Sequence, residues 1–295
     1  MGCNCKNKEN KVEEKREIKP LPKKEGPVTT CIFTMIKNEH EYLDDFLSYH
    51  IGIGIDHIFL FEDEGSDSHD EIASKYGDKV TLKSVTDVHE KNPNDPFPWM
   101  KYYQYYKACV QWIHDNYDYD WCFSIDCDEF ITPTDDFPEC LRRYEDYDAI
   151  YLYWKNYGWS GHLHKPPHDK PIWEIFTEEC GYTLFDKQNT TITQVCFNMR
   201  RFDKSFINGP HFTTGYWVKT DMTRELKDIT FDVMYLRHYI TKSFEEYIWK
   251  LNTRGMRWNG HRGINDFFEM HPHLAYEKDA MLDKIGYDGH ELPRN

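Results

Sequence analysis

Short apolar runs alternate with amphipathic segments along the first half of the chain. The apolar runs and the intervening segments, whose apolar residues recur at helical spacing, cover in order residues 30–35, 39–50, 57–61, 69–76, 80–85, 99–117 and 121–125. Continuous apolar strands are typical of a sheet that is covered on both faces, and strands that alternate with helices are typical of parallel pairing through right-handed crossovers. The pattern predicts an α/β fold with a mostly parallel central sheet and helices on both faces.

The second half of the chain has a less regular pattern. Residues 149–154 and 234–239 are apolar runs that predict two further strands. Ser243 and Glu246 have the spacing of a capping box, in which each side chain satisfies a backbone N–H of the first helical turn. A helix is therefore expected to begin at Ser243 and to run to about residue 253.

The domain boundary is set by a change in composition near residue 26. Residues 1–26 alternate Lys and Glu and are too polar to bury surface that would offset the entropy of ordering, so we predict a disordered tail. Residues 27–295 are expected to form a single domain. Its first half, residues 27–131, has a layout typical of nucleotide binding, and residues 132–295 form the second half.

Composition narrows the class of protein. The chain has 295 residues, of which 39% are hydrophobic, so it is long enough for a sizeable core. The formal net charge of -15 argues against a broad nucleic-acid-binding surface. The nine cysteines show no paired framework, and the sequence contains neither an apolar run of membrane-spanning length nor a secretory signal. We expect a soluble, cytoplasmic protein with no transmembrane segment; the sequence does not indicate its oligomeric state.

The strongest candidate chemistry lies in the tripeptide that begins at Asp126 and ends at Asp128. These two carboxylates follow the apolar run 121–125, and if the strand continued through them its period of two would place both on one face. Two like charges held so close need a cation, and carboxylate oxygens favour Mg²⁺ or Mn²⁺, which complete their coordination with water or a diphosphate. The pair therefore indicates nucleotide-sugar chemistry, with an ordinary solvated strand as the alternative for the tripeptide alone.

Several motifs, taken together and in order, resemble the GT-A fold glycosyltransferases of the family 2 and family 92 group. The resemblance spans about residues 30–255. Its pieces are residues 35–39, Asp63 with Ser66 and Asp67, Gln104, residues 120–130, residues 156–161, and residues 236–243 with Glu245, Glu246 and Lys250. The resemblance implies a GT-A fold, which is Rossmann-like, with a less regular C-terminal half that binds the acceptor.

The resemblance also implies a metal site. Asp126 and Asp128 would hold a metal that bridges the donor diphosphate, with Asp126 shared between the metal and the ribose. His238 would be a third ligand, and its imidazole suits Mn²⁺ better than Mg²⁺. Lys242 would contact phosphate as a point charge.

A second group of residues is expected around the nucleoside. Met35, Asn38 and Glu39 follow or end the first strand and would edge the nucleoside pocket. Asp63 lies where the second strand ends, and a carboxylate there can accept the N3–H of uracil, which favours a UDP donor. Gln104 would hydrogen-bond the donor sugar or phosphate.

Inversion at the transferred sugar needs a group that takes the proton of the acceptor hydroxyl. Glu174 is the first candidate for this catalytic base and Glu129 is the second. The sequence alone does not choose between them.

These expectations combine into one functional hypothesis. The chain is expected to be a metal-dependent, inverting glycosyltransferase that moves a hexose from a UDP-sugar to a hydroxyl of a glycan or glycoconjugate. Two alternatives stay open. One is a metal-dependent phosphohydrolase or nucleotidyltransferase, and the other is a carbohydrate-binding protein that keeps the fold without catalysis.

Overall fold

The computed structural model describes residues 21–89, 98–189, 192–207, 209, 211–220, 231–253 and 263–287. Residues 1–20 of the predicted tail lie outside these ranges. The strands are β1 (Thr30–Ile36), β2 (His57–Glu62), β3 (Val80–Ser84), β4 (Trp121–Ser124), β5 (Glu129–Pro133), β6 (Ala149–Asn156), β7 (Thr193–Asn198), β8 (Trp217–Lys219) and β9 (Met234–His238). The α-helices are α1 (His40–Gly52), α2 (Asp70–Ala73), α3 (Pro98–Asn116), α4 (Ile172–Ile175), α5 (Leu184–Asn189), α6 (Phe244–Thr253), α7 (Ile264–Met270) and α8 (Lys278–Lys284).

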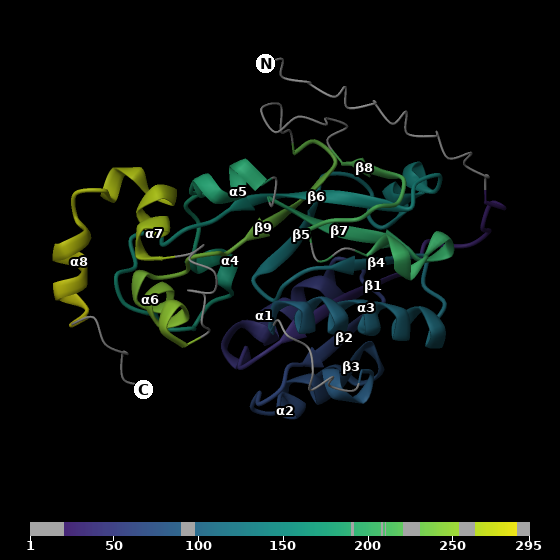
Figure 1. Ribbon diagram of the computed structural model, residues 1–295, viewed down its shortest axis with the longest axis horizontal. Helices are drawn as coiled ribbons and strands as arrows, with labels where there is room; N and C mark the ends of the chain where they lie inside the picture. Colours follow the sequence, from purple (N-terminus) through teal and green to yellow (C-terminus); the bar gives the residue numbers. More distant parts are fainter. Residues whose placement is uncertain are drawn as a thin grey trace, which may run out of the picture.

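The described strands form one nine-stranded sheet (Figure 1). Its order is β3-β2-β1-β4-β7-β6-β9-β5, and β8 pairs with β6 outside this path. β3, β2, β1 and β4 are parallel neighbours, whereas β7 is antiparallel to β4 and β6, and β5 is antiparallel to β9. The predicted α/β fold with a mostly parallel sheet is confirmed.

The first strand shows why helices cover both faces of the sheet. Ile32 and Ile36 point to the core cluster that contains Phe46 of α1. Phe33 points to the opposite cluster, where its ring packs edge-on against Tyr106 of α3 with centroids 5.0 Å apart. Because successive side chains of a strand alternate between faces, one apolar strand supports two layers of helix.

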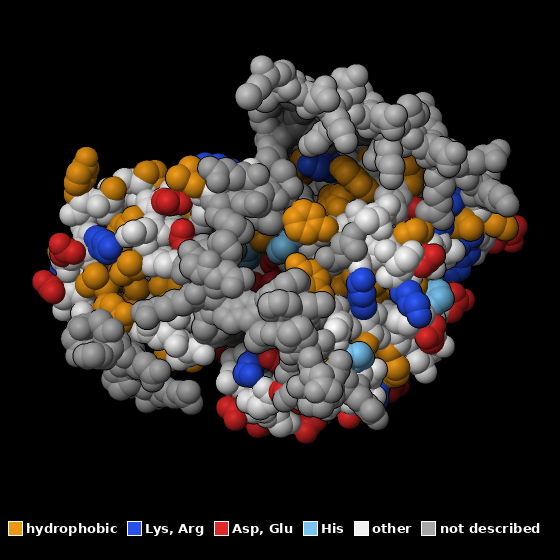
Figure 2. Space-filling view, viewed as in Figure 1, with side chains coloured by type: hydrophobic (Ala, Val, Ile, Leu, Met, Phe, Trp, Pro, Cys, Tyr) orange, Lys and Arg blue, Asp and Glu red, His pale blue; other side chains and the backbone are white. Residues whose placement is uncertain are grey.

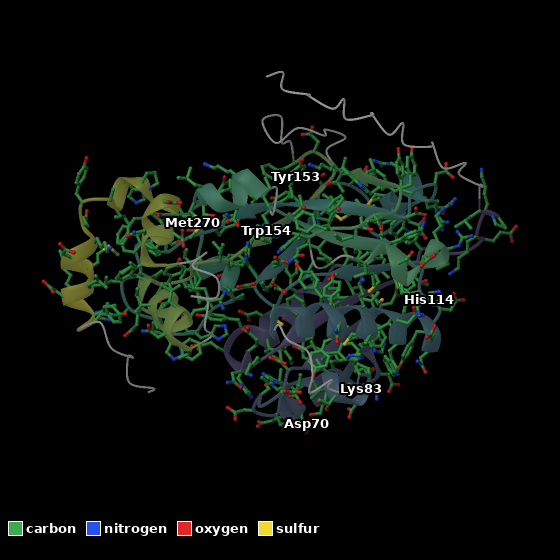
Figure 3. The ribbon with its side chains drawn as sticks, in the orientation of Figure 1. Asp70, Lys83, His114, Tyr153, Trp154 and Met270 are labelled. Carbon is green, nitrogen blue, oxygen red and sulfur yellow. The ribbon has the colours of Figure 1, made fainter. Side chains whose placement is uncertain are left out.

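The C-terminal helices form a separate helical end of the molecule. Figure 1 shows α6, α7 and α8 gathered beyond the ends of β6 and β9, away from β1 to β4. Phe244 of α6 and Phe267 of α7 pack with ring centroids 4.8 Å apart in their own apolar cluster, and Met270, labelled in Figure 3, belongs to that cluster. The predicted helix from Ser243 to about residue 253 is confirmed as α6.

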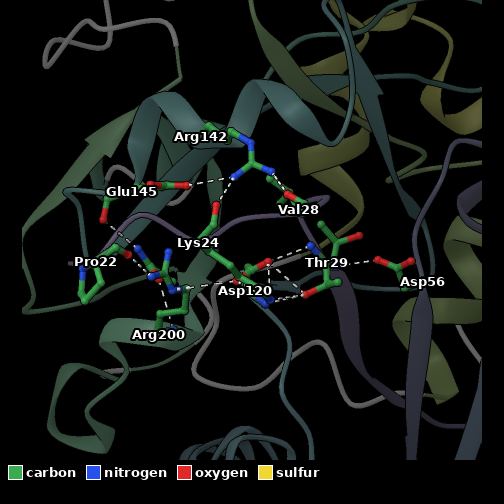
Figure 4. Close-up of polar contacts among 12 residues, drawn as sticks. Pro22, Lys24, Val28, Thr29, Asp56, Asp120, Arg142, Glu145 and Arg200 are labelled. Carbon is green, nitrogen blue, oxygen red and sulfur yellow. Dashed lines mark hydrogen bonds and ion pairs between the residues drawn. The ribbon is translucent and has the colours of Figure 1, made fainter.

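Contacts of the N-terminal segment with the body begin before the predicted domain boundary at residue 27. Asp120 is buried and accepts hydrogen bonds from the backbone N–H of Thr29 at 2.8 Å and from the ammonium of Lys24 at 3.1 Å. Arg142 donates to the carbonyl of Gly26, and Arg200 donates to that of Pro22 (Figure 4). These bonds attach residues 22–29 to the sheet at the end where β1 and β4 begin.

Within the described ranges, no helix combines the length and the apolar character needed to cross a membrane.

Candidate active site

The turn between β4 and β5 presents the two aspartates differently from the prediction. β4 ends at Ser124, and the chain reverses in a turn closed by the N–H of Glu129, which donates to the carbonyl of Asp126 at 3.0 Å. The strand that was predicted to carry both aspartates on one face therefore does not extend to them. The Asp126 residue is exposed, whereas Asp128 is buried, with 9% of its surface exposed.

Asp128 lies within a group of basic side chains. One carboxylate oxygen, Oδ2, is 2.8 Å from Nζ of Lys250, and the other, Oδ1, is 3.8 Å from Nε2 of His238. Burial alone raises the pKa of this carboxyl group, but the charges of Lys250, His238 and Lys242 outweigh burial and hold the pKa well below its usual range. Asp128 is therefore a buried carboxylate that stays ionised.

His238 reaches Asp128 from the end of β9. In the sheet it lies between Glu129 of β5 and Asn156 of β6, so three polar residues form a row across neighbouring strands. Its ring lies 4.3 Å from that of Trp154, which Figure 3 labels near the middle of the molecule. Figure 2 shows histidine and acidic side chains recessed near the centre of this face.

Glu129 supports the turn from below. Its side chain is fully buried and accepts hydrogen bonds from the backbone N–H of Asp126 and from Nε2 of Gln194, both at 3.0 Å. Burial, with added repulsion from Asp126 and Asp128, raises the pKa of Glu129 well above its ordinary value. The buried Glu129 carboxyl group therefore fixes the position of Asp126 through this hydrogen bond.

Lys242 joins the same site from the start of α6. Its ammonium lies 4.4 Å from the centre of the Tyr42 ring of α1, and the Tyr42 hydroxyl donates to Glu246 at 2.9 Å. The hydroxyl and the N–H of Ser243 both donate to Glu246, and the N–H of Glu246 donates back to Ser243, so the predicted capping box is confirmed. This network fixes the first turn of α6 beside α1.

The loops after β1 and β2 are bonded to each other. Oδ1 of Asn38 accepts the N–H of Asp67 at 2.9 Å. The N–H of Glu39 donates to Nε2 of His69 at 3.0 Å, and Nδ1 of His69 donates to Glu62 at 2.9 Å. The two loops therefore form one polar ridge at the carboxyl ends of β1 and β2. Because β1, β2 and β4 are parallel, this ridge lies along the same edge of the sheet as Asp126.

The carboxylates of the acidic loop after β2 have different partners. Glu62 is held by His69, and Glu64 accepts the hydroxyl hydrogen of Tyr105 at 2.8 Å. The Asp63 side chain is 37% exposed and lies 3.6 Å from Nζ of Lys37. The Asp63 side chain is therefore more exposed than that of Glu62, of which 20% is exposed.

The remaining candidates are more scattered. Met35 is half-buried and packs against the cluster on the α3 side of the sheet, and Oε1 of Gln104 on α3 lies 3.3 Å from Nε2 of His89. Glu174 is exposed on α4, where its neighbour Trp173 packs on Phe130. The structure thus gathers one group at Asp128 and a second group along the loops after β1 and β2, and no described contact joins Glu174 to either.

Two important side chains were not assigned from the sequence. Gln194 comes from β7, a strand that was not predicted, and Lys250 was noted as part of a motif without a role. Lys250 lies seven residues after Ser243 and four after Glu246, so these residues share one face of α6. The helix predicted from Ser243, combined with this spacing, was the signal that could have placed Lys250 on the same face as Glu246.

The side chains around Asp128 could supply part of the coordination of a divalent metal. Among residues that the structure describes, no three His, Cys, Asp or Glu side chains are grouped so that they could hold a metal by themselves. Mg²⁺ and Mn²⁺ are commonly bound through one or two carboxylates plus substrate phosphates rather than by an all-protein cage. Asp128, with Asp126 in the same turn and His238 beside it, fits that partial kind of site.

Comparison with known families decides the identity of the domain. Residues 26–269 match the model of glycosyltransferase family 92. The chain belongs to glycosyltransferase family 92. The family 92 domain covers the sheet, the acidic turn, helix α6 and all but the last residue of α7, so every candidate site residue lies within it.

Comparisons of whole proteins add less to the family 92 assignment. No curated protein sequence matches the chain significantly. Solved structures that it resembles include a glucosyl-3-phosphoglycerate synthase from Mycobacterium tuberculosis in complex with Mn²⁺, UDP and glucosyl-3-phosphoglycerate, at 11% identity and a TM-score of 0.33, with 59% of this chain and 57% of that chain covered. HddC from Yersinia pseudotuberculosis aligns at 10% identity and a TM-score of 0.32, over 65% of this chain and 89% of that chain. The chain spans 43% and 57% of the first two matched structures.

Proposed function

We propose that this family 92 glycosyltransferase is metal-dependent and inverting, and that it moves a hexose from a UDP-sugar to a hydroxyl of a glycan or glycoconjugate. The observation that supports the proposal most is the buried, ionised Asp128, which has Lys250, Lys242 and His238 around it. A complex of a metal with a diphosphate needs a carboxylate that binds the metal and positive side chains that bind the phosphates. The side chains at Asp128 have this pattern of charge.

In this proposal Asp126, Asp128 and His238 would hold Mn²⁺ or Mg²⁺ at the donor diphosphate. The bound metal would offset the negative charge that develops on the departing UDP. Lys242 contributes a second positive charge for the phosphates. Glu129 and its partner Gln194 keep the Asp126 turn in place, because the Asp126 N–H depends on the buried Glu129 carboxyl group.

The nucleoside is proposed to lie along the polar ridge of the β1 and β2 loops. Asn38 and Glu39 would line it, with Met35 at its base. Asp63 would accept the N3–H of uracil, since its carboxylate is partly exposed. Gln104 would contact the donor sugar or phosphate from α3.

Glu174 is proposed as the catalytic base that takes the acceptor proton, with Glu129 as the second candidate. Glu174 is exposed, so an acceptor hydroxyl can reach its side chain. Glu129 is fully buried and already accepts hydrogen bonds from Asp126 and Gln194, so it is the less accessible of the two candidates.

Titration calorimetry tests the donor assignment. The wild-type protein is expected to bind UDP more tightly with Mn²⁺ than without it. Asp63→Ala is expected to weaken UDP by about 10- to 100-fold, the loss of one hydrogen bond to a charged group, and to leave pyrophosphate affinity unchanged.

Asp118→Ala is the matched control, because Asp118 is exposed just before β4, at the opposite edge of the sheet. Equal losses for UDP and pyrophosphate in Asp63→Ala would remove Asp63 from base recognition. Failure of the wild-type protein to bind UDP at all would contradict the proposed function.

A further inference from the structure

Lys250 is fixed over the acidic turn rather than free on the surface. Its ammonium is 2.8 Å from Oδ2 of Asp128, and 20% of its side chain is exposed. The helix that carries it is attached at its start, where Glu246 accepts hydrogen bonds from Ser243 and from Tyr42 of α1. Two independent contacts therefore orient this face of α6 toward the site.

A buried carboxylate requires a partner, because an uncompensated charge in the interior is strongly destabilising. Lys250 makes the shorter of the two ion pairs of Asp128, at 2.8 Å from Oδ2, and it occupies one of the two oxygens of the carboxylate on which a metal would bind. An ammonium and a dication at the same carboxylate repel each other. A metal at Asp128 would therefore weaken the ion pair between Lys250 and Oδ2.

We propose that Lys250 neutralises Asp128 in the free protein and transfers to the donor diphosphate when a divalent metal and a nucleoside diphosphate bind together. This inference rests on the proposed function and assigns a positioning residue to it. In the complex the diphosphate replaces Asp128 as the negative partner of Lys250. The metal replaces Lys250 as the positive partner of Asp128.

The exchange makes metal and nucleotide binding cooperative. Metal alone would add a dication to a site where Lys250 and Lys242 already lie near Asp128. Nucleotide alone would find Lys250 engaged by the carboxylate. When both are present, the metal frees Lys250 for the diphosphate and the diphosphate draws Lys250 away from the metal. Such coupling is reciprocal, so UDP raises the affinity for Mn²⁺ by the same factor as Mn²⁺ raises the affinity for UDP.

The test measures binding of Mn²⁺ alone, UDP alone and the two together by calorimetry, without any assay of activity. In the wild-type protein, saturating UDP is expected to tighten Mn²⁺ by at least about tenfold. Lys250→Met keeps the length and apolar stem of the side chain but removes its charge. This variant is expected to bind Mn²⁺ alone about tenfold more tightly, to bind UDP in saturating Mn²⁺ about tenfold more weakly, and to lose most of the coupling.

Lys75→Met is the matched control, because Lys75 forms an exposed ion pair with Asp44 at 3.6 Å, and it should change none of these constants. If the wild-type protein binds both ligands and Lys250→Met changes neither, Lys250 is a static structural contact and the inference is wrong. Absence of coupling in the wild-type protein overturns the inference even if the variant does not fold. Failure of the wild-type protein to bind Mn²⁺ or UDP overturns the proposed function as well.

Discussion

Asp128→Asn is expected to abolish the effect of Mn²⁺ on UDP affinity, so that the dissociation constants with and without metal become equal. Asparagine has nearly the same volume as aspartate but lacks the charge that holds a dication. In the wild-type site that charge is buried and kept ionised by Lys250, His238 and Lys242. The measurement is titration of UDP in the presence of Mn²⁺ and then of chelator.

The same substitution should leave the protein folded. Lys250 is partly exposed and can turn its ammonium toward water once Asp128 is neutral. We therefore expect a loss of about 1–3 kcal/mol in the free energy of unfolding, as for one unmatched buried polar contact. Asp118→Asn is the control. A Mn²⁺ effect of wild-type size in Asp128→Asn would show that the metal binds elsewhere.

The second prediction with a large effect is that acid destabilises the protein through His50. His50 is fully buried on α1, where Nδ1 donates to the carbonyl of Phe46 at 2.8 Å and Nε2 accepts the N–H of Ile131 at 3.1 Å. Burial lowers the pKa of His50 from 6.5 to about 3. The ring is thus neutral when folded, and protonating Nε2 would break its bond to β5.

The direction of the effect follows from which state binds the proton. Below about pH 6.5 the unfolded chain protonates His50 while the folded protein does not, so stability is full above that pH and falls as pH drops toward 3. At pH 4.5 the loss from His50 is expected to be about 2–3 kcal/mol, because each pH unit between the two pKa values contributes about 1.4 kcal/mol.

Denaturant unfolding at pH 7 and pH 4.5 measures this loss. His50→Gln is expected to be less stable than the wild-type protein at pH 7, because the packing and hydrogen bonds of the ring are lost. It should also lose less stability between the two pH values. His114→Gln, a change at an exposed histidine, should keep the full wild-type dependence. The same dependence in His50→Gln as in the wild-type protein would exclude His50 as the source.

Local patterns in the sequence predicted most of the strands and helices in the first half of the chain. In β1, Ile32 and Phe33 pack on opposite faces of the sheet, and the sequence shows this as a continuous apolar run. β5 and β7 were not predicted. β5 begins at Glu129 directly after an acidic turn, and β7 carries polar residues such as Gln194 that are nevertheless buried, so neither has the composition of a typical core strand.

The sequence predicted where in the fold the candidate site lies, but not how its side chains are arranged. Asp126 and Asp128 follow a buried strand, which correctly located them at its carboxyl end, but their opposite exposure depends on a chain reversal that the apolar run does not reveal. The partners come from far along the chain: Lys250 is 122 residues from Asp128, and Gln194 is 65 residues from Glu129. Periodicity reports which face a residue occupies, and it does not report which distant element packs there.

Product analysis tests the central claim most directly. The protein would be incubated with Mn²⁺, a panel of UDP-hexoses and a panel of glycan acceptors, and the products would be identified by mass spectrometry. We expect release of UDP together with an acceptor that has gained one hexose, and no such product from Asp128→Asn. Consumption of the nucleotide to free phosphate or to a nucleotidylated product, with no glycan gaining a sugar, would contradict the account.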